Sequence, residues 1–65
     1  MEHTMEELKE AKRQIDSTLH KLQEVIKTFE AKGNPTRYKS QITLARRRIL
    51  AFEIAVELIE REMES

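Results

Sequence analysis

Apolar residues recur along this chain at alternating intervals of three and four positions, in two separate stretches. Such heptad spacing predicts two amphipathic α-helices, each burying one stripe against the other as in a coiled coil. No stretch alternates with a period of two, so we expect no β-strands. We call the two series together the seam. Its members are Met5, Leu8, Lys12, Ile15, Leu19, Leu22, Ile26 and Phe29 in the first helix, and Tyr38, Ile42, Ala45, Ile49, Phe52, Val56, Ile59 and Met63 in the second.

The break between the two series falls at Gly33, Asn34 and Pro35. Gly33 readily takes the left-handed conformation that follows a helix. Asn34 is a favoured N-cap, and Pro35 suits the first position of a new helix. The first helix opens with Thr4 and Glu7, which have the spacing of a capping box, in which side chain and backbone bond reciprocally.

These signals predict a single helical-hairpin domain over residues 1–65. Its first helix spans about 5–32, its turn 33–34 and its second helix about 35–63. A loop this short makes the two helices antiparallel neighbours. We therefore expect an all-α protein built on an antiparallel helical hairpin.

The second helix carries more apolar residues than one neighbouring helix can cover. From Ile49 to Ile59, two glutamates are the only polar residues. A helix that is apolar nearly all round is normally buried on more than one side. We therefore expect a homodimer, a four-helix bundle in which the second helix packs on its two-fold copy and the first helices lie outside. The predicted dimer interface consists of Leu44, Ala51, Ile54, Ala55 and Leu58.

A two-fold axis near Ala51 fits this apolar stripe. Leu44 and Leu58 each lie seven residues from Ala51, so an axis there pairs Leu44 with Leu58 of the other copy. The small side chains of Ala51 and Ala55 allow the two backbones to approach closely. Such an interface uses the same patch on both subunits, as a closed dimer requires.

The charges predict that the two copies are antiparallel. Residues 1–26 sum to −2, residues 27–48 to +6 and residues 49–65 to −4. The hairpin is therefore basic at its loop end and acidic at its open end. Antiparallel stacking of two hairpins brings unlike ends together, whereas parallel stacking brings like ends together.

The composition narrows the function classes. With no cysteine and two histidines, the chain lacks the residues for a disulfide framework or a zinc ribbon. One glycine cannot form a phosphate-binding loop, and no apolar run approaches the ~20 residues that span a bilayer. We expect no cofactor, no catalytic or metal site, no membrane contact and a cytoplasmic location. A chain of 65 residues without disulfides or metals also relies on partners for stability.

Lys12 occupies a seam position, where a polar residue fixes the register of packed helices. Its ammonium group can extend toward Glu53 and Glu60; the alternative is a catalytic lysine with a lowered pKa. His3 and His20 lie far apart and form no Glu-x-x-His motif, so we expect both to be solvated. The acidic residues of the second helix form a ridge that we expect to be solvated rather than to act as acid–base pairs. They are Glu53, Glu57, Glu60 and Glu64.

Basic residues gather toward the loop end of the hairpin. Such residues can bind phosphates and release counterions, which makes this end a candidate nucleic-acid site. Against this, Phe29 and Tyr38 belong to the seam and are not free to stack on bases. Three successive arginines also point in different directions around a helix, and we expect at least one to meet glutamates of the other subunit. The candidate contacts with nucleic acid or an acidic partner are Lys32, Arg37, Lys39, Arg46, Arg47 and Arg48.

In its length, single short turn and heptads, the chain resembles in outline the plasmid copy-control Rop hairpin, an antiparallel dimer that binds paired RNA loops. No functional residue of that family is matched here. Ser40 and Gln41 resemble the start of the Ser-Gln-Glu-Leu-Asp motif of the short sporulation phosphatase hairpins, which act on a phosphorylated response regulator. This chain continues with Ile42, Thr43 and Leu44, so both acidic residues of the motif are replaced and the activity is not implied.

The sequence therefore predicts a small non-enzymatic regulatory or adaptor protein that acts through helix-mediated protein–protein contacts as a homodimer. The alternative is an RNA- or DNA-binding regulator that uses the basic loop end. In a third interpretation the apolar stripe covers a different protein, and the homodimer is only a storage form.

Overall fold

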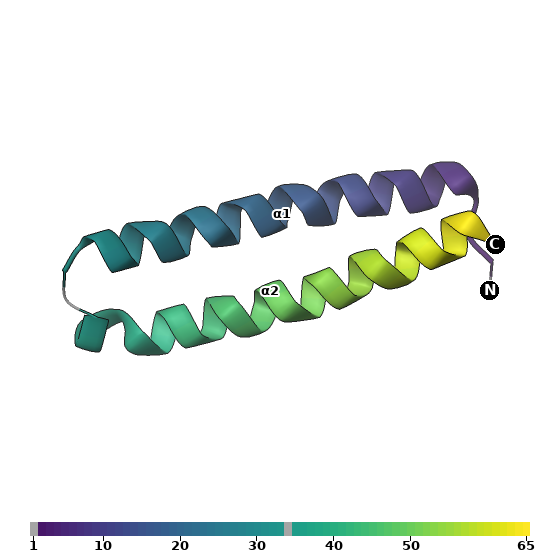
Figure 1. Cartoon of the computed structure of the whole chain (residues 1–65). Helices are drawn as coiled ribbons and strands as arrows, with labels where there is room; N and C mark the ends of the chain where they lie inside the picture. Colours follow the sequence, from purple (N-terminus) through teal and green to yellow (C-terminus); the bar gives the residue numbers. More distant parts are fainter. Residues whose placement is uncertain (1, 34) are drawn as a thin grey trace.

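The structure is a computed structural model, and it describes residues 2–33 and 35–65. Its described part contains two α-helices, α1 at Met5–Ala31 and α2 at Pro35–Glu64. The helices lie side by side and antiparallel, so the turn forms one end of a long hairpin and both chain termini lie at the other (Figure 1). The Cα atoms extend over 45 × 16 × 15 Å. The predicted all-helical hairpin is confirmed.

Before the turn, the last residues of α1 form a hydrogen bond between residues three apart instead of four. The helix ends at Ala31, one residue earlier than predicted, because the amide of Lys32 donates to the carbonyl of Phe29, three residues back, at 3.3 Å. Gly33 follows with a φ of 69°, which confirms the predicted left-handed conformation. The predicted N-cap, Asn34, lies outside the described residues.

The predicted capping box at the start of α1 is confirmed. The amide of Thr4 donates to Oε1 of Glu7 at 2.9 Å, and the amide of Glu7 donates to Oγ1 of Thr4 at 3.1 Å. The bond from the Thr4 amide is the main reason that the pKa of Glu7 lies below its usual value. Beside this end, α2 continues to Glu64, one residue further than predicted.

The seam lies where the two helices face each other. Leu8 and Ala45 are buried, at 8% and 5% exposure, and the remaining seam residues are half-buried apart from Met5. Met5 is 45% exposed, because at the end of the hairpin no further helical turn covers it. The seam residues Phe29 and Tyr38 stack on each other beside the turn, with ring centroids 4.7 Å apart.

This hairpin has a thin core. No side chain of the described residues is fully buried. The accessible surface is 5379 Å², whereas a compact monomer of 7.7 kDa exposes roughly 4,300 Å². The excess of about 1,000 Å² arises because two rods in contact bury only one stripe each.

Acidification should weaken the start of α1 through Glu7. The ionised carboxylate accepts the Thr4 amide, so the pKa of Glu7 is lower in the folded chain than its ordinary value of 4.5. Ionised Glu7 therefore stabilises the fold above about pH 4.5, and this contribution is lost as the pH falls through the lowered pKa. Urea titrations at a fixed protein concentration should show a smaller acid-induced loss in Glu7→Gln than in the parent chain.

The matched control for this experiment is Glu6→Gln. Glu6 is a neighbouring exposed carboxylate in the same first turn of α1, and it does not belong to the capping box. This variant should retain the full acid-induced loss. An equal reduction in both variants would contradict the role given to Glu7.

Candidate interaction surface

The side of α2 turned away from α1 carries the most exposed of the large apolar side chains. Leu50 is 60% exposed, Leu58 57%, Ile54 51% and Leu44 48%. With about 3.6 residues per turn, these positions lie on the side of α2 opposite the seam. Ala51 is exposed among them and Ala55 is half-buried at their edge. We call this surface the outer face; it comprises Leu44, Leu50, Ala51, Ile54, Ala55 and Leu58.

Sequence reasoning placed five of these six residues in a dimer interface, which stays a prediction, and it missed Leu50. Leu50 directly follows the seam residue Ile49, so the heptad assignment gave it no role. Its position four residues before Ile54 is the signal that places it on the same side of the helix. On α1, Val25 is also 41% exposed.

Charged side chains border the outer face. The four glutamates of the predicted acidic ridge, at positions 53, 57, 60 and 64, are all exposed. Glu57 accepts a hydrogen bond of 2.7 Å from Arg61 one turn further along α2. Such exposed pairs within one helix contribute a few tenths of a kcal/mol, so they orient side chains more than they stabilise the fold.

Lys12 binds within its own helix. Its Nζ lies 2.9 Å from Oδ2 of Asp16, one turn further along α1. This hydrogen bond and the charge of Asp16 raise the pKa of Lys12 above its ordinary value, with a smaller contribution from Glu60. A raised pKa is the opposite of what a catalytic lysine base needs. The expected extension toward Glu53 and Glu60 is therefore replaced mainly by a pair at the favoured i,i+4 spacing.

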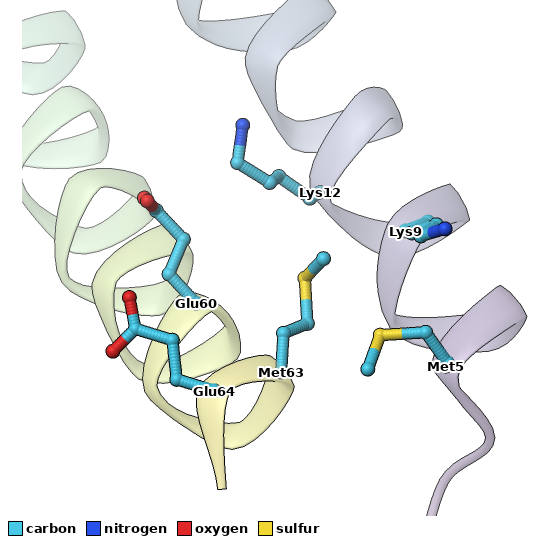
Figure 2. Close-up of a pocket in the computed structure, with 6 residues that line it drawn as sticks. All are labelled: Met5, Lys9, Lys12, Glu60, Met63 and Glu64. Carbon is cyan, nitrogen blue, oxygen red and sulfur yellow. The ribbon is translucent and has the colours of Figure 1, made fainter.

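Lys12 also lines an open groove of about 410 Å³ between the ends of the helices. Figure 2 shows the methionine side chains approaching each other between α1 and α2, with lysines on the α1 side and glutamates on the α2 side. Opposite charges on the two helices attract across this groove, which favours antiparallel pairing of the helix ends. Its lining residues are Met5, Lys9, Lys12, Glu60, Met63 and Glu64.

At the loop end, cations lie over the stacked aromatic pair. Nζ of Lys32 is 5.9 Å from the ring centroid of Phe29 and 5.3 Å from that of Tyr38. The guanidinium carbon of Arg37 is 5.6 Å from the Tyr38 centroid. These distances fall within the range of cation–π attraction. Two of the six candidate nucleic-acid residues thus contact the aromatic rings of their own chain.

The other basic residues of this end are spread around α2. Arg46 lies 3.8 Å from Oε1 of Glu30 on α1, so this arginine meets a glutamate of its own chain. Lys39 and Arg46 line an open groove of about 380 Å³ with Glu30. Arg47 and Arg48 follow on the same helix and point about 100° and 200° away from Arg46. The structure therefore does not gather the six predicted residues into one patch.

His3 and His20 are both exposed. Within residues 2–33 and 35–65, His, Cys, Asp and Glu side chains form no cluster of three or more that could hold a metal ion. In the same residues, neither helix combines the length and the apolar character needed to cross a membrane.

No protein-family model, curated protein or solved structure matches this chain. A functional conclusion must therefore come from the surface itself. Its most distinctive part is the outer face.

Replacing Lys12 with leucine should stabilise the hairpin. Lys12 is a seam position whose side chain is 34% exposed, so an apolar residue there gains contact with α2. Lys12→Leu should raise the free energy of unfolding by about 1 kcal/mol, as measured by urea denaturation at a fixed protein concentration.

Lys21→Leu is the matched control, because Lys21 is exposed on the same helix, outside the seam and outside the groove. This variant should leave the denaturation midpoint nearly unchanged. If Lys12→Leu is destabilised while Lys21→Leu is neutral, the Lys12–Asp16 pair contributes more to stability than an apolar seam contact would.

Proposed function

We propose that this protein is a small regulatory or adaptor module that works as a homodimer through the outer face of α2. The observation that carries the proposal is the group of four large aliphatic side chains, each about half exposed on one side of α2. Charged residues make up 37% of the chain, so such an apolar group is unusual for its surface. Contiguous exposed apolar side chains mark interaction sites.

The surface area supports the same proposal. The hairpin exposes about 1,000 Å² more than a compact chain of its mass, and each partner in a standard interface contributes about 800 Å². Covering the open half of Leu44, Leu50, Ile54 and Leu58 contributes about 1 kcal/mol per side chain. A partner on this face would therefore supply the second apolar layer that the thin core lacks.

A second copy is the partner that best fits the pattern. Leu44 and Leu58 lie at equal distances on either side of Ala51, so the face is complementary to itself under a two-fold rotation. Such a dimer leaves the polar side of each α1 open for another protein, which is the basis of the adaptor role. The role is proposed as non-enzymatic; the pairing of Lys12 with Asp16, which raises the pKa of Lys12, argues against the alternative of a catalytic lysine base.

An RNA- or DNA-binding regulator remains the alternative proposal. The contacts of Lys32 and Arg37 with aromatic rings, and of Arg46 with Glu30, support it less well, because a phosphate must compete with them. Salt-sensitive binding of RNA by the parent chain, lost when Arg46, Arg47 and Arg48 are all replaced by alanine, would favour this alternative.

Light scattering after gel filtration tests the homodimer. The parent chain should elute with a mass near twice 7.7 kDa at micromolar concentration. Leu58→Glu places a charge on the outer face, opposite Leu44 of the other copy, so it should yield single chains or lose helical circular dichroism on dilution.

Val25→Glu is the matched control, since Val25 is an exposed aliphatic residue on α1, outside the outer face. It should leave the mass near that of a dimer. A stable, fully helical single chain of the parent sequence at micromolar concentration would contradict the proposed homodimer.

A further inference from the structure

The order of charged residues along α2 is opposite to the order that the helix macrodipole favours. A helix favours acidic side chains near its N-terminus and basic ones near its C-terminus, because of its macrodipole. The first turn of α2 has no acidic residue, and the basic residues of α2 precede its acidic ones, except for Arg61 in the last turn. The basic residues of its first half are Arg37, Lys39, Arg46, Arg47 and Arg48, and the acidic residues of its second half are Glu53, Glu57, Glu60, Glu62 and Glu64.

The charges of α1 do not neutralise the basic half of α2. Its C-terminal half, residues 18–31, lies beside the basic half of α2 and carries two basic and two acidic side chains. Ion pairs between neighbouring turns of α1, such as Lys12–Asp16 and Lys27–Glu24, use much of its charge within the helix. The pair between the helices, Arg46 with Glu30, is 3.8 Å long and more than half exposed.

Arg47 is the charged residue placed within the outer face. On the helix surface it is flanked by Leu44 three residues before it and by Leu50 and Ala51 three and four residues after it. None of the positions one turn away on α2 is a carboxylate. An arginine covered by a partner needs an acidic group within reach of its long side chain, because burying the charge unpaired is costly.

We propose that Arg47 of one copy pairs with Glu57 of the other across the outer face, and that this pair fixes the antiparallel orientation of the two chains. The inference rests on the proposed homodimer and adds the residues that select its geometry. With the two-fold axis at Ala51, residues equally distant from Ala51 lie opposite each other. Arg47 then lies level with Ala55 of the other copy. Glu57 lies about 3 Å further along that helix, on the opposite edge of the outer face from Ala55, where the long side chain of Arg47 can extend to it.

Glu57 can accept this second donor. Its carboxylate is exposed and already holds the guanidinium of Arg61 at 2.7 Å through Oε1. The pairing therefore builds a network of two arginines on one carboxylate, repeated twice by symmetry. In a parallel dimer, Arg47 would instead meet Arg47 of the other copy, and the like charges would repel. In this pairing Arg47 binds the other copy of the chain rather than nucleic acid.

Charge reversal tests the pair. Arg47→Glu should raise the dissociation constant of the dimer about tenfold at low salt, because each of two symmetric pairs becomes repulsive. Adding Glu57→Arg to this variant should restore most of the affinity. Lys21→Glu is the matched control: it makes the same change of charge at an exposed position of α1, away from the outer face, and should leave dissociation nearly unchanged.

Cross-linking tests the orientation independently. The chain has no cysteine, so introduced thiols are unique. In the antiparallel dimer the two copies of residue 44 are about 21 Å apart along the axis, at about 1.5 Å per residue, beyond the reach of a short bis-maleimide. A mixture of Leu44→Cys and Leu58→Cys chains should therefore cross-link, and Leu44→Cys alone should not.

The outcomes separate the two proposals. A parent chain that sediments as a single chain at every concentration overturns the homodimer itself. A dimer that tolerates Arg47→Glu, or in which Leu44→Cys cross-links with itself, overturns the pairing and the orientation while the homodimer stands. Helical circular dichroism of each variant excludes loss of folding as the cause.

Discussion

One straight helix can cover only one side of another, and the structure of this protein depends on that constraint. Two packed helices meet along a line, so each buries a single stripe. Helix α1 has one apolar stripe, whereas α2 has two on opposite sides. The seam uses one stripe of each helix and leaves the outer face of α2 open. The thin core and the large accessible surface are both consequences of this imbalance.

The two ends of the hairpin are held by different interactions. At the loop end, the stacked rings of Phe29 and Tyr38 and the cation of Lys32 join the helices on either side of the turn. At the open end, a capping box starts α1, and Met5 and Met63 approach each other in a groove lined by lysines of α1 and glutamates of α2 (Figure 2). Both ends thus fix the antiparallel pairing of α1 and α2, and neither covers the outer face between them.

The two helices differ in how their charged residues are arranged and paired. In α1, acidic and basic residues alternate at spacings of three and four, and they pair along their own helix. In α2, basic residues come first and acidic residues follow, so few of them can pair locally; Arg61 with Glu57 is an exception. A helix whose charges are separated in this way is matched by an antiparallel copy of itself. This electrostatic match and the open apolar stripe of α2 support the same partner.

The sequence by itself determined the helices, the turn, the capping box and the seam, because these depend on periodicity and on bonds between residues close in the chain. It also indicated the apolar surplus of α2. Only the tertiary structure decided which side chains stay open, since exposure depends on what lies nearby in space. That is why sequence reasoning missed the exposure of Leu50, the partial exposure of Met5 at the end of the seam, and the pairing of Arg46 with Glu30 across the hairpin. Lys12 pairs with Asp16 rather than with the glutamates of α2. A neighbour one turn away on the same helix is always within reach, whereas a residue on another helix is within reach only if packing brings it there.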